Sequence, residues 1–429
     1  TIFQLFQRPI SIFNGTVMIV TMKRIFYLLL ICLNCISIQA KIKKAVYVII
    51  DGVPADMIER LQPPTICDIA SHGGYARAYT GGEIGGYSET ATISAIGYTN
   101  LLTATWYNKH NVGGNSNLTP NYNYWSIFRI AKEQPKMCKT GIYSSWTDNR
   151  TVLIGEGKPE TNYLKIDYVR DGYDLDTINF PHKADELHIF DIDERVSKEA
   201  SESIKKDAPD LSWVYLWYTD DAAHIKGNGS FFDEYVMKAD EQVKRIWDAV
   251  KYREENFNED WMIVVTTDHG REESGFGHGK QSKRERTTWI STNVAVNERF
   301  RSEDLAITDI APSICRYLGF EVPTDVLWEQ DGIPFIGKAD IYDLQTMSYD
   351  SKVKLSWKSY NPLTSQPVTI YIACSNKFKE GGKDEWIELA TVPSIQGSYE
   401  IDLSCLPQST FYKFVVKTDE NHQTRWLRK

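Results

Sequence analysis

The hydrophobic residues of the chain gather in short uninterrupted runs that end in acidic residues. Three such runs are KAVYVIID (44–51), SWVYLWYTDD (212–221) and WMIVVTTDHG (261–270). Continuous β-branched and aromatic runs of this length are typical of parallel strands buried on both faces. Between the second and third runs, residues 231–255 carry apolar side chains at helical spacing. Strands that alternate with helices predict an α/β fold with a doubly wound, mostly parallel sheet.

The pattern changes near residue 340. Segments such as VKLSWKSY, VTIYIACS and FYKFVVKT are short, alternate only in part, and are separated by Gly, Pro, Asn and Ser. Short strands between turn residues are typical of an all-β sandwich. We therefore predict an α/β domain over residues 41–340 and a small β-sandwich domain over residues 341–429.

The first 40 residues contain a candidate export signal. A basic start at residues 22–24 precedes the apolar stretch IFYLLLICLNCISIQA, which ends in the small residue Ala40. These features are typical of a secretory signal peptide. The prediction is a secreted, periplasmic or cell-surface protein, and an N-terminal membrane anchor is the alternative.

Charge and cysteine content narrow the choice of partners. The formal net charge of −9 argues against nucleic acid as the main partner, because phosphate backbones favour basic surfaces. Small phosphorylated substrates stay open, since bound metal ions can reverse the local sign of charge. The five cysteines after the signal contain no CxxC motif, which excludes a thiolate zinc site of the usual spacing. Cys374 and Cys405 are close enough in sequence to pair.

Acidic and histidine side chains follow the predicted strands. Ligands of doubly wound sheets bind beyond the carboxyl ends of the strands, so these side chains are expected to share one site. Each has a plainer reading alone, as a turn residue or a surface histidine, but three strand ends supplying Asp or His together favour a site. Mixed carboxylate and imidazole ligands suit two borderline-soft divalent ions, most simply zinc. The candidate ligands are Asp51, Asp220, His224, Asp268, His269 and His278.

A pair of such ions about 4 Å apart is the arrangement used for phosphoryl transfer, and it requires a hydroxyl or water nucleophile. Residues 88–115 are rich in hydroxyl groups, and composition does not choose among them. The candidates are Ser88, Thr90, Thr92, Ser94 and Thr99.

These motifs resemble those of the alkaline phosphatase superfamily, and most closely its nucleotide pyrophosphatase/phosphodiesterase branch, over residues 44–338. Asp51-Gly52 matches the family's first metal motif, DDAAHIKG (220–227) its Asp-x-x-Gly-His, and TDHG (267–270) its Asp-His-Gly. His278-Gly279 matches the late His-Gly. Three glycines of the family pattern are replaced, by Ala104, Asn111 and Ala223.

The resemblance also implies roles for residues in the hydroxyl-rich stretch. Counting back from the family's Thr-Gly and His-Gly positions places its nucleophile at Ser94, and an asparagine that holds a phosphoryl oxygen falls at Asn115. One metal ion would then bind Asp220, His224 and His278. The other would bind Asp51, Asp268 and His269, together with the oxygen of Ser94. Ser94 would attack phosphorus and form a covalent phosphoseryl intermediate.

The substrate class is less constrained. Members of this branch tend to carry Thr followed by an aromatic residue, whereas this chain has Ser94 and Ala95. Aromatic residues such as Tyr98 and Trp146 could form a wall for the second substituent of a phosphodiester or a nucleotide, although core packing is the commoner role of such residues. Two metal ions with the neutral Asn115, and no assured cation, favour a phosphodiester. Arg150 could instead neutralise the extra charge of a phosphomonoester, so a phosphomonoesterase is the alternative. No Cys/Ser-x-Pro-x-Arg motif of a sulfatase is present.

A non-catalytic secreted binding protein is a third possibility, disfavoured by the intact ligand set. The C-terminal segment resembles a fibronectin type III module through Trp357 on an early strand and Tyr412 at the start of YKFVV. We expect this segment to dock or tether the protein, in line with cell-surface or envelope association.

Overall fold

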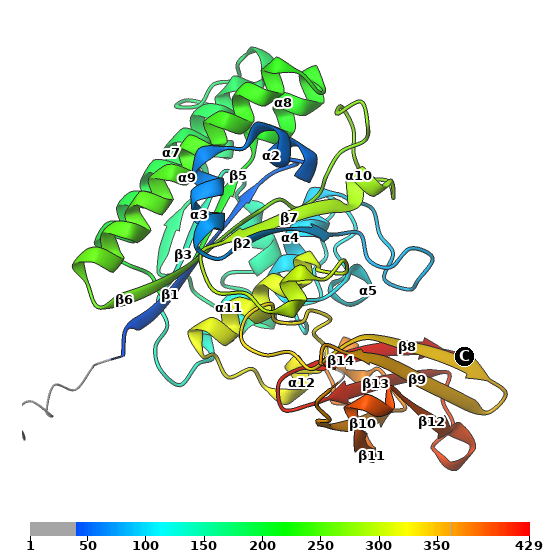
Figure 1. Ribbon diagram of the computed structural model, residues 1–429. Helices are drawn as coiled ribbons and strands as arrows, with labels where there is room; N and C mark the ends of the chain where they lie inside the picture. Colours follow the sequence, from blue (N-terminus) through cyan, green and yellow to red (C-terminus); the bar gives the residue numbers. More distant parts are fainter. Residues whose placement is uncertain (1–39, 362) are drawn as a thin grey trace, which may run out of the picture. The chain divides into compact units, whose positions relative to one another are not determined.

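The computed structural model describes residues 40–361 and 363–429 (Figure 1). Thr1–Ile42 and Lys43–Lys429 are separate units, and the following description concerns the second. The predicted signal peptide lies, apart from Ala40, outside the described residues. Across the part of the chain that is described, no helix has the length and apolar character needed to cross a membrane.

The centre of the α/β part is a seven-stranded sheet of order β2-β7-β6-β1-β5-β3-β4. β5 is parallel to β1 and to β3, and β3 is parallel to β4. β7 is antiparallel to its neighbours β6 and β2. The predicted mostly parallel sheet is thus confirmed, with an antiparallel edge. The strands are β1 (Ile42–Ile50), β2 (Gly74–Tyr79), β3 (Thr140–Ser144), β4 (Tyr168–Arg170), β5 (Leu211–Leu216), β6 (Glu259–Thr266) and β7 (Thr287–Thr292).

Helices cover both faces of this sheet (Figure 1). The predicted helix over residues 231–255 is confirmed as α9, but the apolar run 212–221 is divided between a strand and a helix. The α-helices are α2 (Ala55–Leu61), α3 (Pro64–His72), α4 (Ser94–Thr103), α5 (Tyr107–His110), α6 (Ile127–Lys132), α7 (Leu187–Lys206), α8 (Tyr218–Lys226), α9 (Ser230–Asn256), α10 (Lys283–Arg286), α11 (Ile310–Leu318) and α12 (Thr324–Leu327). Shorter turns include the π-helix η1 (Asn149–Ile154) and the 3-10 helices η3 (Tyr173–Leu175), η4 (Ala184–Glu186) and η9 (Leu403–Cys405).

The side chains of β1 divide between two hydrophobic cores, because alternate residues of a strand point to opposite faces. Val46, Val48 and Ile50 pack with α7 and α9 on one face, while Tyr47 and Ile49 pack with α4 and α11 on the other. This explains why the strand is apolar throughout.

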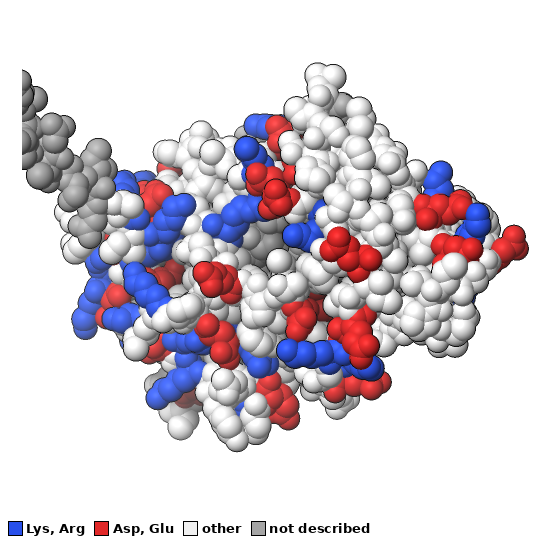
Figure 2. Space-filling view, turned by 90° about the horizontal axis from the view of Figure 1, so that it is seen from below, with Lys and Arg blue, Asp and Glu red and all other residues white. Residues whose placement is uncertain are grey.

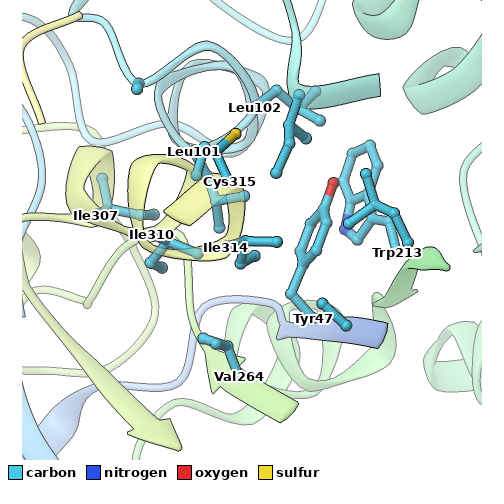
Figure 3. Close-up of a cluster of buried hydrophobic side chains, with 14 of the residues drawn as sticks. Tyr47, Leu101, Leu102, Trp213, Val264, Ile307, Ile310, Ile314 and Cys315 are labelled. Atoms are coloured by element: carbon cyan, nitrogen blue, oxygen red, sulfur yellow. The ribbon is translucent and has the colours of Figure 1, made fainter. Parts of the chain in front are cut away.

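The second of these cores fixes the position of α4. Leu101 and Leu102 of α4 lie against Ile314 of α11, over Tyr47 of β1 and Trp213 of β5 (Figure 3). Burying a leucine side chain stabilises a fold by about 2 kcal/mol, so this contact holds α4 firmly on the sheet. All ten residues of α4 are buried, including its first residue, Ser94.

The C-terminal segment forms two antiparallel sheets, of order β11-β10-β13-β14 and β12-β9-β8, around a common apolar core. The predicted all-β character of this segment is confirmed. Its strands are β8 (Ile341–Tyr349), β9 (Lys352–Ser359), β10 (Pro367–Ala373), β11 (Trp386–Pro393), β12 (Ser398–Asp402), β13 (Phe411–Lys417) and β14 (His422–Arg428).

The suggested pairing of Cys374 with Cys405 is wrong, and both thiols are free. Cys374 directly follows β10 of the four-stranded sheet, whereas Cys405 lies in η9, next to β12 of the other sheet. On the surface, Lys and Arg side chains are interspersed with Asp and Glu over the face in Figure 2, and neither sign dominates it.

Candidate active site

Side chains from three strand ends and one loop meet beyond the carboxyl edge of the sheet. Asp51 directly follows β1, and Asp268 and His269 follow β6. Asp220 and His224 lie on α8, the helix that begins after β5. The i, i+4 spacing on α8 brings His224 Nε2 within 3.2 Å of Asp220 Oδ2.

Two overlapping groups of these side chains have the geometry of metal ligands. Asp220, His224 and His278 form one group, and Asp51, Asp220 and His269 form the other, with the ligand atoms of each group within 4.8 Å of one another. The Nε2 atoms of His224 and His278 are 3.1 Å apart. Asp268 adjoins the second group, since its Oδ2 lies 3.2 Å from His269 Nε2. The structure therefore brings all six predicted ligands together.

Two of the histidines are oriented by backbone carbonyls. His269 Nδ1 lies 2.9 Å from the carbonyl oxygen of Gly270, and His278 Nδ1 lies 2.8 Å from that of Thr92. Each Nδ1 donates its hydrogen to the carbonyl, a tautomer inferred from these partners, which leaves Nε2 as a lone-pair donor facing the site. Metal-binding histidines characteristically have this arrangement.

The electrostatics of the cluster favour a bound cation. Burial, together with the charges of Asp268 and Asp220, holds the pKa of Asp51 well above its usual value. Burial also raises the pKa of Asp268 to about 7. Asp51 Oδ1 and Asp268 Oδ2 are buried without a hydrogen-bond partner. Because buried unpaired carboxylate oxygens are costly, a divalent cation would stabilise them, and the residues present fit two such ions.

Close backbone approach at two glycines keeps this cluster compact. A Cβ on Gly52, whose φ is +64°, would lie 2.5 Å from Asp220 Oδ1. A Cβ on Gly97 would lie 2.7 Å from the carbonyl oxygen of Asp268. These distances are far below van der Waals contact, so both positions require glycine for α4 and β1 to reach the site.

The supporting roles of three side chains were not predicted from the sequence, which suggested Tyr98 only for an aromatic wall. The hydroxyls of Tyr98 and Tyr215 donate to Asp51 Oδ2, the latter at 2.6 Å. Arg271, fully buried, donates to Asp220 Oδ1 and also to the carbonyl oxygens of Gly275 (2.6 Å) and Phe276 (2.9 Å). It thus ties Asp220 to the loop that leads to His278. Its place directly after TDHG was the available signal for it.

Two neighbouring side chains offset the effect of burial on the pKa of Asp220. Burial raises the pKa of this carboxyl, but the hydrogen bond from His224 and the charge of Arg271 bring it below its usual value. The ionised form is therefore favoured more at Asp220 than at Asp51 or Asp268.

Ser94 stands at the first position of α4, where the positive end of the helix dipole favours an anion. Its hydroxyl oxygen lies 3.2 Å from His269 Nε2. Asn115 Oδ1 accepts a hydrogen bond from the N–H of Ala95 at 2.9 Å, which leaves the amide NH₂ of Asn115 free to donate elsewhere. Of the other hydroxyls in this stretch, Thr92 donates to the carbonyl of Lys280 and Ser88 accepts from the N–H of Glu83.

These groups open into a cavity of about 370 Å³. One end of the cavity is polar and is lined by Asp51, Ser94, Asn115, Asp220 and His224. The rest of its wall is aromatic and includes one further acidic residue. Lys and Arg are absent from the lining among the described residues. The remaining lining residues are Tyr98, Trp146, Tyr215, Trp217 and Asp221.

Arg150 is not brought to this cavity. It lies in η1, where Nε and Nη2 donate to Asp171 at 2.6 and 3.0 Å and Nη1 donates to Glu156 at 2.5 Å. Both carboxylates are largely buried, and the guanidinium is held between them. The Arg side chain suggested for binding the extra charge of a monoester is thus engaged elsewhere.

Three solved structures are distantly similar to the chain. Ps i-CgsB in complex with k-i-k-neocarrahexaose is 14% identical, with a TM-score of 0.46, over 76% of this chain and 86% of that one. Murine ectonucleotide pyrophosphatase/phosphodiesterase 5, as an inactive variant with AMP, is 13% identical, with a TM-score of 0.43, over 66% of this chain and 96% of that one. TAB5 alkaline phosphatase is 13% identical, with a TM-score of 0.42, over 66% and 100%. These similarities are too remote to assign an activity.

Comparison at the level of sequence is more specific. No curated protein matches the chain. The family model described as type I phosphodiesterase / nucleotide pyrophosphatase matches residues 45–282, more than half of the chain. This range includes most of β1, all of α4, α8 and β6, and every candidate ligand described above. The chain therefore belongs to the type I phosphodiesterase / nucleotide pyrophosphatase family and is a phosphoric ester hydrolase.

Proposed function

We propose that this enzyme hydrolyses phosphodiesters that carry an aryl or nucleoside substituent, with Ser94 as nucleophile. The observation that carries the proposal is the cavity itself, which joins a cluster of metal-ligating side chains to an aromatic wall and has no Lys or Arg among its described lining residues. A diester bears one negative charge fewer at phosphorus than a monoester dianion, and it has a second organic group that needs such a wall.

Two divalent ions, zinc by the chemistry of the ligands, would be held by the clustered side chains. Asp220, His224 and His278 would bind one ion, and Asp51, Asp268 and His269 the other. When bound, such ions lower the pKa of a hydroxyl and neutralise the charge on the attacking and leaving oxygens.

Ser94 is well placed to attack. Its oxygen adjoins His269 at the start of α4, so a phosphoryl group within reach of it also faces the positive end of the helix dipole. Attack would form an O–P bond to Ser94 as the alcohol leaves, and water would then release the phosphoryl group from the serine. The free amide NH₂ of Asn115 would donate to an equatorial phosphoryl oxygen and stabilise the charge there.

The aromatic wall would receive the leaving substituent. Trp146 and Trp217 are both partly exposed and line the cavity, which suits stacking against an aryl ring or a nucleobase. Both rings also pack against the hydrophobic core, but they keep an exposed part, whereas Tyr98 and Tyr215 are fully buried and engaged with Asp51.

The test compares bis-p-nitrophenyl phosphate with p-nitrophenyl phosphate on the same purified, metal-loaded enzyme. We expect the higher kcat/KM on the diester, and we expect Trp146→Ala to lower the diesterase rate more than the monoesterase rate. Arg150→Ala is the matched control and should leave the ratio unchanged. A monoester preference of about a hundredfold, or 2.7 kcal/mol in barrier height, that disappears in Arg150→Ala would establish a phosphomonoesterase instead.

We further propose that the C-terminal sheets form a fibronectin type III-like domain that tethers the exported enzyme to the cell surface or envelope. Support comes from the hydroxyl of Tyr412, near the start of β13, which accepts a hydrogen bond from the N–H of Ser409 at 3.1 Å, as in the tyrosine corner of β-sandwiches. Export is tested by fractionating cells that make the full chain or a chain lacking residues 1–40. Retention of both forms in the cytoplasm would refute it.

A further inference from the structure

A second group of potential metal ligands lies at the beginning of α7, apart from the candidate active site. It consists of His182, Glu186 and His188, whose ligand atoms lie within 4.8 Å of one another. The imidazole rings of His182 and His188 have centroids 4.5 Å apart and planes at 68°. None of the three residues lines the active-site cavity.

The geometry of this group suits tetrahedral coordination. Zinc binds imidazole nitrogen and carboxylate oxygen at about 2.0–2.2 Å, which places neighbouring ligand atoms about 3.4 Å apart. His188 Nδ1 lies 3.5 Å from Glu186 Oε2, close to the edge of such a tetrahedron. Two imidazoles and one carboxylate, with water in the fourth position, are the ligand types that favour zinc over the oxygen-preferring magnesium and calcium ions.

An independent observation concerns His188 itself. Its side chain is only 7% exposed, and its Nδ1 is buried without a hydrogen-bond partner. This nitrogen lies beside the carboxylate of Glu186, and the ring of His182 packs against that of His188. An unpartnered buried ring nitrogen is destabilising, and a metal ion between the three side chains would satisfy it.

The nearby positive side chains do not perform this role. Lys183 pairs with Asp191, and Lys226 lies 3.4 Å from Asp185. An ion pair between Glu186 and His188 alone would also leave the approach of His182 unexplained. We propose that His182, Glu186 and His188 bind a structural divalent cation, best matched by zinc, in addition to any ions of the active site.

The location of the site indicates what the ion would stabilise. The segment between β4 and α7 contains only the short turns η3 and η4. At its end, the carbonyl oxygen of Asp185 accepts a hydrogen bond from the hydroxyl of Tyr218, on α8, at 2.7 Å. α8 carries Asp220 and His224. A cation at the start of α7 would therefore fasten this segment against the helix that supplies two active-site ligands.

The experiment counts bound zinc by elemental analysis after dialysis of the full-length protein against limiting free zinc. We expect His182→Gln and Glu186→Gln each to lose one ion per chain relative to wild type. His72→Gln and Glu202→Gln, which change exposed residues on α3 and α7 outside the group, should keep the wild-type count. Asp220→Asn changes the active-site cluster. Because the two sites are separate, the double variant Asp220→Asn/His182→Gln should hold less zinc than His182→Gln alone.

Cobalt replacement gives a second measurement that does not depend on activity. Tetrahedral cobalt absorbs visible light, and we expect titrated wild-type protein to show a component that is missing in His182→Gln. His182→Gln and Glu186→Gln both change exposed side chains, so both variants should fold. Near-UV circular dichroism would verify this. Equal zinc content and equal cobalt spectra in wild type and in both variants would overturn the proposal.

Discussion

The hydroxyl oxygen of Ser94 lies 3.2 Å from Nε2 of His269, although the two residues are 175 positions apart in the sequence. The contact arises because α4 packs directly on the end of β6, where Gly97 leaves room for the backbone of Asp268. A hydroxyl at a helix start and a metal-ligating imidazole are thereby placed at the same end of the cavity. This juxtaposition singles out Ser94 among the hydroxyls of the surrounding stretch.

Ser94→Ala should reduce kcat by at least about 10³-fold while the fold and the metal content stay near wild type. The substitution removes only the nucleophilic oxygen and retains a residue that suits a helix start. Steady-state kinetics on bis-p-nitrophenyl phosphate, with metal analysis of the same samples, would measure both effects. Thr90→Ala is the matched control and should retain most of the activity. The reverse outcome for the two variants would assign the nucleophile to Thr90.

Replacement of Arg271 should weaken metal binding. In Arg271→Met, Asp220 loses its guanidinium partner and the carbonyls of Gly275 and Phe276 lose their donor, so the loop before His278 is released. We expect faster loss of zinc to a chelator and a lower unfolding midpoint. Arg284→Met, which changes a partly exposed arginine that also binds a backbone carbonyl, should have a much smaller effect. Tighter zinc binding in Arg271→Met would instead mean that the guanidinium competes with the cation.

Sequence reasoning reached the residues that follow strands but not those that support them. Asp51, Asp268 and His269 interrupt apolar runs, and such interruptions are visible without a structure. Tyr98 and Tyr215 sit within an apolar helix and an apolar strand, where aromatic residues usually belong to the core, so the pattern gives no sign that their hydroxyls reach Asp51.

The orientation of Arg150 and the end of the strand within residues 212–221 could not be predicted from the sequence, for similar reasons. Which way a loop arginine points depends on the carboxylates that the fold brings to it, here Asp171 and Glu156, and these cannot be located from spacing. β5 ends at Leu216 and α8 begins at Tyr218. The boundary was not predicted because continuous hydrophobicity does not distinguish a buried strand from a buried helix turn.

Acid should destabilise the protein through buried neutral histidines. His110 Nε2 lies 2.8 Å from Asn100 Oδ1, and its Nδ1 accepts from the N–H of Val112, an arrangement that requires the neutral ring. Burial lowers the pKa of His110 to about 3 and that of His422 to about 4. Because the folded-state pKa is depressed, the stabilisation is complete above the unfolded pKa of about 6.5 and is lost as the pH falls below it.

The expected loss is about 2 kcal/mol per histidine between pH 7 and pH 5. Urea unfolding at the two pH values would measure it. His110→Gln should make the free energy of unfolding less dependent on pH by about that amount. His72→Gln, at an exposed position, should leave the dependence as in wild type. An unchanged dependence in His110→Gln would show that His110 is not a source of acid sensitivity.

A buried ion pair joins the C-terminal sheets to the α/β part, so breaking this pair should lower the free energy of unfolding. Lys413 on β13 is fully buried and pairs with Glu329, which follows α12, and with Asp384 at 2.5 Å. Lys413→Met would leave two buried carboxylates without their cation, a change that typically costs about 3–5 kcal/mol. Lys352→Met, which breaks an exposed pair with Glu400 on the same segment, should cost about 0–1 kcal/mol. Urea unfolding midpoints of the two variants would give the comparison.

If Lys413→Met fails to fold, Lys413→Met combined with Glu329→Gln and Asp384→Asn should restore folding, because the unpaired charges are then removed. Similar midpoints for Lys413→Met and Lys352→Met would show that the buried pair does not hold the sheets to the α/β part.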